Sequence, residues 1–564
     1  MRLSASLKAL AALAAAIVLG AQRAPERIEY SFTPVLQAGA LVAVQVDLRF
    51  RGEADGQTNL RLPQSWGGRD ALWRAITDLE AVSGGRLSEG EGPSQRVLTH
   101  RPGARVHVRY RIVQDYEGPP SAREGNSYRA VVQPGYFHLI GEAAMVTPEG
   151  ADSATPVRFQ MRRLPRGWSF ASDLEHEGLT LADVWSSISV GGDFRILIGA
   201  ATNLRVAIRG DWDWNDADFI ATVDRVIAGH RRFWDDEGAP YLVTVLQTEQ
   251  PQPGWLSIGG TGLGDAFAFF ATPNAQAAPI TRTLAHESLH TWIPLEIGGA
   301  PQEGEALQYW LSEGFTDFYT GRLLVREGIW TPRDFADDLN TMLRAYAFSS
   351  ARTAANERIG SDFWNDQDVH HLPYQRGRLT ATLWDARLRA SGQSLDLLMH
   401  TLRERVDAGE EEEPAGPAFS ALALERIEGF AADYENYVLA GQPVLLPEDV
   451  FAPCGRVVTF EAAPFHRGFD IEATSANNNT ITGLDPASPA YAAGLREGMV
   501  ILRREAGVIG DAEQELVYVL RDGETERTIR YFPRGPGLRT VQQFELAAPL
   551  EGETLAQCVR TLGG

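Results

Sequence analysis

The chain has 564 residues, of which 74 are acidic and 52 are Lys or Arg, and its formal net charge is −22 at pH 7. An acidic chain without basic blocks argues against nucleic acid or anionic membranes as partners. Lys8 is the only lysine, which excludes enzymes that depend on a P-loop lysine or on a lysine Schiff base.

The first segment has the features of a secretory signal peptide. Arg2 and Lys8 lie in a short basic region, residues 9–19 are apolar, and Gly20-Ala21 offers a cleavage site of small residues. We therefore predict a signal peptide over residues 1–21 and an exported protein, periplasmic or secreted. The mature chain is expected not to insert stably into a membrane, because no later stretch approaches about 20 apolar residues.

Residues 22–210 have the alternation of antiparallel strands. Apolar and polar residues alternate over 42–50 and over 105–112, and shorter runs at 194–198 and 204–208 continue the pattern. A period of two predicts strands with one buried and one solvated face. We expect an N-terminal β-rich domain in which His107 is simply solvated.

A predicted catalytic domain, residues 211–450, opens with a helix and a strand. Apolar residues recur at helical spacing over 215–234, and a strand is expected over 241–248. His230 is expected on the surface of that helix. A glycine-rich run, 259–270, follows without the long βαβ unit that a nucleotide site requires.

Residues 286–290 read H-E-x-x-H on a helix predicted over about 279–293. Residues i and i+4 lie one turn apart, so His286 and His290 can reach one cation, and Glu287 can take a proton from water beside it. Two exposed helix histidines are the alternative interpretation. A third ligand decides between the two interpretations.

Glu313 is the candidate third ligand, and 22 residues separate it from His290. It belongs to a Trp-Leu-Ser-Glu-Gly-Phe-Thr-Asp-Phe-Tyr run with one apolar side, at the start of a helical half predicted over 305–445. Catalytic zinc commonly takes two histidines and one glutamate. Asp317, one turn after Glu313, is the candidate carboxylate to orient a ligating imidazole.

Cys454 and Cys558 are the only cysteines. An even pair in an exported protein favours a disulfide, with two buried thiols as the alternative. Between them, Arg467-Gly468-Phe469-Asp470-Ile471 resembles the carboxylate-binding loop of PDZ domains, and residues 481–501 resemble the strand, Ser-Pro-Ala helix and Gly-Leu-x-x-Gly turn of such modules. Met499 and Asp470 depart from the usual pattern.

The two metal-binding runs and the PDZ-like segment together resemble the glycyl aminopeptidase family of gluzincin metallopeptidases. The resemblance implies a multidomain α+β protein: an N-terminal antiparallel β domain, a thermolysin-like zinc peptidase domain with a helical half, and a C-terminal PDZ-like domain over 451–564. It also implies peptide or protein substrates. The PDZ-like segment makes a C-terminal peptide a second expected ligand, received by the loop of Gly468 and Phe469, and a structural appendage that binds no peptide is the alternative.

Two further expectations follow from the resemblance. Pro373-Tyr374-Gln375-Arg376-Gly377 is similar to a segment of zinc aminopeptidases whose tyrosine stabilises the oxyanion, so Tyr374 is the candidate for that role. The run 259–270 corresponds to an edge strand that pairs with substrate. Relatives carry a glutamate there for the substrate amine, and this chain offers only Asp265 nearby.

The sequence thus predicts a zinc-dependent peptidase with ligands His286, His290 and Glu313, the base Glu287 and the oxyanion donor Tyr374. The aminopeptidase mode follows the family, and an endopeptidase remains open because the edge-strand glutamate is missing. A binding scaffold with a vestigial zinc site and a metal-dependent hydrolase of other amides or esters are the remaining alternatives.

Overall fold

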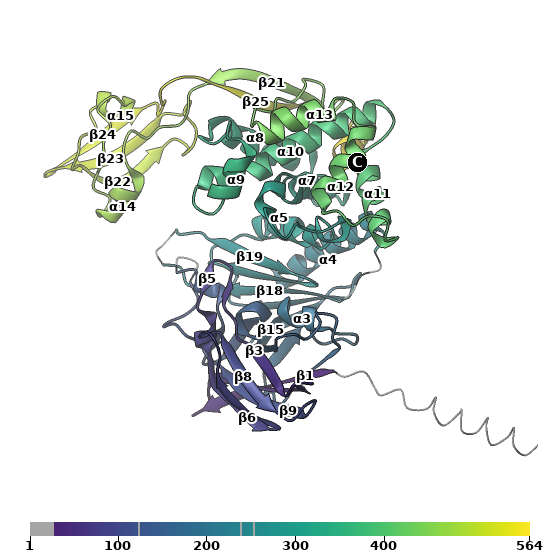
Figure 1. The fold of residues 1–564 in the computed structure, drawn as a ribbon. Helices are drawn as coiled ribbons and strands as arrows, with labels where there is room; N and C mark the ends of the chain where they lie inside the picture. Colours follow the sequence, from purple (N-terminus) through teal and green to yellow (C-terminus); the bar gives the residue numbers. More distant parts are fainter. Residues whose placement is uncertain (1–26, 122–123, 237, 239, 252–253) are drawn as a thin grey trace, which may run out of the picture. The chain divides into compact units, whose positions relative to one another are not determined.

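A computed structural model describes residues 27–121, 124–236, 238, 240–251 and 254–564 of the chain (Figure 1). The predicted signal peptide lies outside the described residues. The chain divides into two compact units, the first ending at Thr291 and the second beginning at Trp292. Within the described part of the chain, none of the helices combines the length and the apolar character needed to cross a bilayer.

Sheets dominate the N-terminal part of the first unit, as predicted. Their orders are β13-β1-β2-β9-β6, β12-β3-β8-β7 and β10-β11-β15-β14, and their strands pair antiparallel except for the parallel pair β1 and β13. The bounds are β1 Ile28–Gln37, β2 Ala40–Arg51, β3 Gln57–Arg61, β6 Ile76–Ser83, β7 Gly85–Glu89, β8 Gln95–His100, β9 Arg105–Ile112, β10 Val131–Gln133, β11 Tyr136–Ile140, β12 Thr147–Pro148, β13 Val157–Met161, β14 Ser169–Ser172 and β15 Ile188–Gly192.

The predicted alternation buries one face of β2 and β9, where Val46, Leu48 and Val108 are fully buried. On the opposite face the expectation for His107 was wrong. Its Nε2 lies 2.6 Å from Asp47 Oδ1, and the side chain is partly buried. Arg49 of β2 lies directly opposite His107 of β9, so Asp47, two residues from Arg49 on the same face, comes within reach of the imidazole. The period-two pattern of one strand does not reveal such a cross-strand partner.

Short elements connect these sheets. They are the hairpin β4 Ser65–Trp66 and β5 Arg69–Asp70, and the short helices η1 Leu72–Ala75, η2 Asn126–Tyr128, α2 Gly141–Ala144 and α3 Leu181–Trp185. The helix η2 places Tyr128 against the sheet described next.

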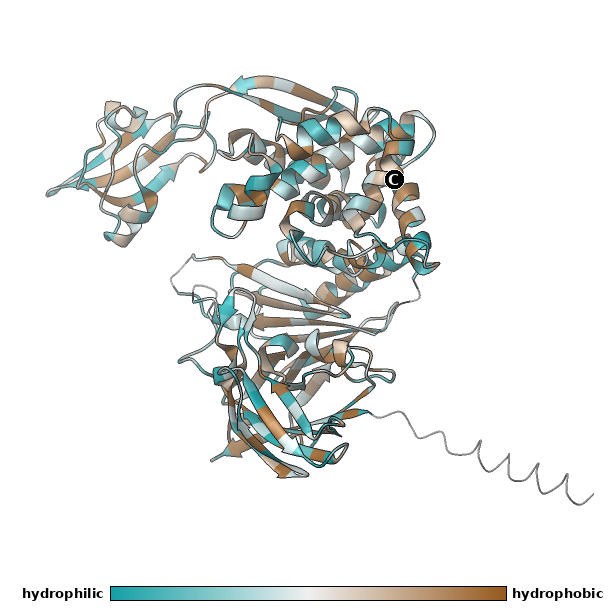
Figure 2. Ribbon diagram, in the orientation of Figure 1, coloured by the Kyte–Doolittle hydropathy of each residue, from teal (hydrophilic) through white to brown (hydrophobic). Residues whose placement is uncertain are grey.

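A mixed sheet in the order β16-β17-β18-β20-β19 supports the catalytic motif. Its strands are β16 Arg195–Ile198, β17 Leu204–Arg209, β18 Tyr241–Gln247, β19 Ile258–Leu263 and β20 Ala266–Ala271. The middle strands β18 and β20 are apolar (Figure 2) and almost wholly buried. Because β19 ends the order, the prediction of an edge strand in this region is confirmed.

Helices α4 (Asp216–Trp234) and α5 (Ala277–Glu287) pack with this sheet in a shared core. Asn215 caps α4, because its side-chain oxygen accepts hydrogen bonds from the amides of Ala217 and Asp218. The predicted helix over 215–234 and the strand over 241–248 are therefore confirmed to within a residue.

The second unit is mainly helical up to residue 439. The bounds are η4 Leu295–Ile297, η5 Glu305–Gln308, α6 Tyr309–Ser312, α7 Gly314–Arg326, α8 Pro332–Phe348, α9 Asn356–Asp362, α10 Gln367–Ala390, α11 Leu395–Asp407, α12 Ala415–Arg426, α13 Phe430–Asp433 and the π-helix η6 Tyr434–Leu439. Thr331 caps α8 with Pro332 in the first turn and forms a capping box with Asp334.

The C-terminal segment contributes to two separate cores. Residues 469–531 have a small core of their own, which includes Phe469, Ile481, Leu495 and Leu520. Its elements are α14 Ile471–Ala476, α15 Pro489–Ala492, β22 Val500–Ala506, β23 Leu516–Asp522 and β24 Thr525–Tyr531.

The flanking segments of this small core pack with the helices instead. Strands β21 (Gly455–Ala462) and β25 (Arg539–Leu546) pair antiparallel, and helix α16 spans Gly552–Gly563. Val457, Phe544 and Leu562 share a core with residues of α8 and α10. Cys454 and Cys558 form a disulfide that closes a loop over a sequence separation of 104 residues, and both are fully buried.

Candidate metal centre

The metal motif begins on an α-helix and ends in a tighter turn. Helix α5 stops at Glu287, and residues 288–291 form the 3₁₀ helix η3, so the α-helix predicted to reach about 293 is shorter than expected. The last turn tightens to 3₁₀ geometry, as is frequent at helix C-termini, and this change falls between the two histidines. The imidazole centroids of His286 and His290 still lie 5.0 Å apart.

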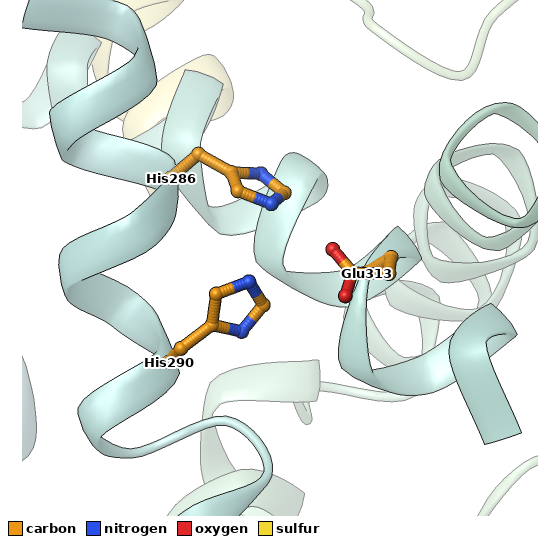
Figure 3. A group of neighbouring side chains, drawn as sticks. All are labelled: His286, His290 and Glu313. Atoms are coloured by element: carbon orange, nitrogen blue, oxygen red, sulfur yellow. The ribbon is translucent and has the colours of Figure 1, made fainter. Parts of the chain in front are cut away.

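His286, His290 and Glu313 form a group that could hold a metal ion. Each offers one ligand atom, and these atoms lie within 4.8 Å of one another. Figure 3 shows both imidazoles turned toward the Glu313 carboxylate. His286 is buried and the other two are partly buried. Two imidazoles and one carboxylate at this separation fit the donor set of a catalytic zinc site, which keeps a further position open.

The Glu287 carboxylate lies beside the edge strand β19. A Cβ atom built on Gly262 would lie 3.7 Å from Glu287 Oε2 and 3.6 Å from the Glu287 carbonyl oxygen. A glycine therefore leaves room between the strand and the candidate base. This is where an extended substrate would pass if it paired with the edge of the sheet.

His230 is a buried partner of the motif, and its expected place on the surface was wrong. The residue is only 1% exposed, and its Nδ1 lies 2.9 Å from the Oγ of Ser288. Burial lowers the pKa of His230 to about 3, so the ring is neutral. The contact lies at the residue where α5 passes into η3, between the two histidines of the motif.

Glu313 is positioned by a contact between two glycines. It separates α6 from α7, and the next residue, Gly314, meets Gly377 of α10. A Cβ on Gly377 would lie 2.0 Å from the Trp310 carbonyl oxygen and 2.6 Å from the Gly314 Cα. The helix backbones touch here, which only glycine allows. Asp317, in the first turn of α7, is buried at 6% exposure.

Tyr374 lies in α10, one turn before Gly377. Its ring centroid is 5.9 Å from that of His370. Burial lowers the pKa of His370, with His371 adding to the shift, while the nearby Glu313 carboxylate opposes it. Burial also raises the pKa of Tyr309, and the negative charges of Glu305 and Glu313 add to this effect. The Tyr309 phenol therefore belongs to the surroundings of Glu313, and Tyr374 lies beside His370, on whose pKa the same carboxylate acts.

Asp265 faces a different set of charges. Burial raises the pKa of Asp265. The positive charges of His176 and Arg231 oppose this shift, and the negative charges of Asp183 and Asp236 add to it. Gly264, its neighbour in the turn after β19, approaches Ser186, since a Cβ on this glycine would lie 3.2 Å from the Ser186 Oγ. This environment gives Asp265 ionic neighbours other than the metal motif.

The two residues predicted for peptide capture differ in their surroundings. Gly468 has a φ of +87°, and a Cβ there would lie 2.6 Å from Ser488 Oγ. Phe469 is 8% exposed and belongs to the small core. Asp470 caps α14 by accepting a hydrogen bond from the Ala473 amide at 2.9 Å.

Two functional candidates escaped the sequence analysis. One is His230, although Val226, Ile227 and Phe233 place position 230 inside the apolar stripe of α4, and that signal was available. The other is Tyr128, whose hydroxyl donates a hydrogen bond to the carbonyl of Gly260 in β19 at 3.2 Å. No sequence spacing reveals this contact, because 132 residues separate the partners.

Comparison with known proteins supports this centre. Residues 280–368, which include His286, His290 and Glu313, match the family model described as M61 glycyl aminopeptidase. No curated protein sequence gives a significant match.

One solved structure of similar fold matches nearly the whole chain. The chain is similar to an aminopeptidase N family protein from Idiomarina loihiensis, with a TM-score of 0.65, 15% identity, and coverage of 94% of this chain and 100% of that one. An M1 zinc metallopeptidase from Deinococcus radiodurans aligns with a TM-score of 0.43 and 15% identity over 76% of this chain and 96% of that one.

The family match confirms the resemblance predicted from the two metal-binding runs. It covers the motif helix, the third ligand and the helix that follows. The sequence match and the assembled ligand group identify the chain as a zinc metallopeptidase of the aminopeptidase type, similar to the glycyl aminopeptidase family.

Proposed function

We propose that this chain is an exported aminopeptidase that cleaves peptides with water activated at the His286, His290 and Glu313 centre. The observation that carries the proposal is the convergence of these three ligand atoms within 4.8 Å, next to a base that lies beside an edge strand. Zinc is the metal that fits this donor set.

The residues have separate roles in the reaction. When bound, zinc supplies Lewis acidity, which acidifies water and polarises a carbonyl oxygen. Glu287 accepts a proton from the attacking water and passes it to the leaving amine. Tyr374 donates a hydrogen bond to the oxygen that becomes negative as the carbonyl is attacked. Asp317 is assigned to orient a ligating imidazole.

An endopeptidase is the second candidate, and one observation favours it. The edge strand β19 carries no carboxylate, and the charges that act on Asp265, in the turn after it, are those of His176, Asp183, Arg231 and Asp236. A carboxylate for the substrate amine is therefore not provided by this strand.

The C-terminal segment is proposed as a PDZ-like module, in which Gly468 and Phe469 lie in the loop that would receive a peptide C-terminus.

Hydrolysis of free and N-acetylated versions of the same peptides tests the mode. An aminopeptidase should lose at least about a hundredfold in kcat/KM upon acetylation, because the site is built to bind the amine. An endopeptidase should cleave both versions at similar rates.

Glu287→Gln should lower kcat by a factor of about 10² to 10⁴ with its zinc retained. Glu357→Gln, the same change at the exposed start of α9, should leave kcat unchanged. Absence of hydrolysis of every peptide by the zinc-loaded protein would contradict the proposed function.

A further inference from the structure

The edge of β19 presents backbone groups away from the sheet at alternate residues. The Thr272 amide donates to the Ser257 carbonyl at 3.0 Å, and the same register continues through the pairs of β19 and β20. In an antiparallel ladder, hydrogen-bonded and non-hydrogen-bonded pairs alternate. Gly260 and Gly262 therefore fall in non-hydrogen-bonded pairs, and their amides and carbonyls point to the open edge.

Tyr128 already occupies one of these outward groups. Its hydroxyl donates to the Gly260 carbonyl at 3.2 Å. The ring packs against Phe270 at 5.2 Å between centroids. It also packs against Gly67, where an added Cβ would lie 3.0 Å from the Tyr128 Cγ. The phenol is therefore held in place by packing on two sides, independently of the hydrogen bond.

The hydrogen bond between Tyr128 and Gly260 lies close to the candidate base Glu287. Gly262 adjoins the Glu287 carboxylate, and Gly260 lies two residues away along the strand, a distance of about 7 Å. Burial raises the pKa of Tyr128, and the negative charge of Glu287 adds to that shift, which agrees with the closeness of the two side chains.

We propose that Tyr128 is a specificity-determining residue that ends the pairing of substrate with β19 at Gly260, and so restricts substrates to short segments on one side of the scissile bond. The inference rests on the proposed function. A substrate chain can pair with the amide and carbonyl of Gly262, but its next amide finds the Gly260 carbonyl engaged and the phenol in its path.

Peptides in which one amide at a time is replaced by an ester test this inference. Alanine oligomers of increasing length, extended on either side of the scissile bond, provide the series. With the wild-type chain, an ester in place of the amide that would face Gly260 should leave kcat/KM unchanged. In Tyr128→Phe the Gly260 carbonyl loses its hydrogen-bond donor, so kcat/KM should be roughly three- to tenfold higher for the amide than for the ester. The kcat/KM of long peptides should rise by the same factor.

Tyr116→Phe is the matched control. Its hydroxyl makes no hydrogen bond to any residue that the structure describes, and it lies in the same connection between β9 and β10. This variant should behave as the wild type. Tyr128→Leu removes the hydroxyl by a second route, and the zinc content and thermal unfolding of each variant show whether it is folded.

The outcomes separate the inference from the proposed function. If no peptide is hydrolysed, the proposed function fails, and equilibrium binding of the same series to Glu287→Gln, with and without Tyr128→Phe, still measures the amide preference. The inference is overturned if long and short peptides react or bind alike in the wild type and the ester scan gives the same result for the wild type and for Tyr128→Phe. Tyr128 then does not limit the substrate.

Discussion

The Nδ1 of His230 lies 2.9 Å from the Oγ of Ser288, the central residue of the metal motif. This contact joins α4 to the point where α5 changes into η3. Ser288→Ala removes the hydrogen bond and should lower the free energy of unfolding by about 1 kcal/mol. Chemical denaturation measures the loss. Ser420→Ala is a suitable control, because its Oγ donates within its own helix to the Gly416 carbonyl, and a larger loss there than at Ser288 would contradict the prediction.

Acid should destabilise the first unit through His138. This side chain is fully buried, with its Nε2 3.0 Å from the Thr244 Oγ1, and burial lowers its pKa from 6.5 to about 3. Below pH 6.5 the unfolded chain binds a proton at His138, whereas the folded chain keeps this imidazole neutral until the pH approaches about 3. The stability is therefore fully present above pH 6.5 and is lost as the pH falls toward 3.

His138→Gln tests this dependence. The free energy of unfolding of the wild type should fall with a slope up to about 1.4 kcal/mol per pH unit steeper than that of the variant over this window. His371→Gln, at an exposed position, should keep the wild-type slope. Equal slopes for the wild type and His138→Gln would show that His138 does not carry this proton linkage.

Gly377→Ala should disturb the position of Glu313. The added methyl group would lie 2.0 Å from the Trp310 carbonyl oxygen in α6 and 2.6 Å from the Gly314 Cα in α7, so α10 must move away from both helices. We expect a loss of about 3 kcal/mol in stability and a loss of about a hundredfold in kcat, since a shift of about 1 Å at a reacting centre has this effect.

Gly321→Ala in α7 provides the comparison. Its nearest neighbour would be a side-chain atom, Arg378 Nη2, at 3.2 Å. A side chain yields more easily than a backbone, so this variant should change stability by less than about 1 kcal/mol. Kinetics and denaturation of both variants check the pair, and equal effects at the two glycines would refute the crossing contact.

Reduction of the Cys454–Cys558 disulfide should weaken the second unit. The bond closes a loop over a sequence separation of 104 residues, which corresponds to about 4–5 kcal/mol on the loop-entropy estimate. Denaturation with and without a reductant, with thiol titration to verify reduction, measures the difference. A chain with both thiols free and an unchanged midpoint would contradict this expectation.

The sequence predicts what local spacing determines. The alternation over 105–112 corresponds to strand β9, and the four-residue interval of His286 and His290 brings the two imidazoles together although the α-helix ends at Glu287. In these cases the interacting residues are neighbours along the chain, so helix or strand geometry brings them together.

Other features depend on tertiary contacts that no spacing encodes. His230 and Ser288 are 58 residues apart, and Tyr128 and Gly260 are 132 apart. Gly314 and Gly377 were visible within two motifs, but only the crossing of their helices explains why neither can carry a side chain. The metal centre was therefore predictable as a set of residues, and its supporting contacts were not.

The metal content of the mature, purified chain tests the central claim most directly. Elemental analysis by mass spectrometry should find about one zinc ion per chain, bound by the donor set of two imidazoles and a carboxylate. Glu313→Gln should lose most of this zinc, while Glu357→Gln should keep it. A wild-type chain without stoichiometric metal, or a Glu313→Gln variant that binds zinc as tightly as the wild type, would contradict the account.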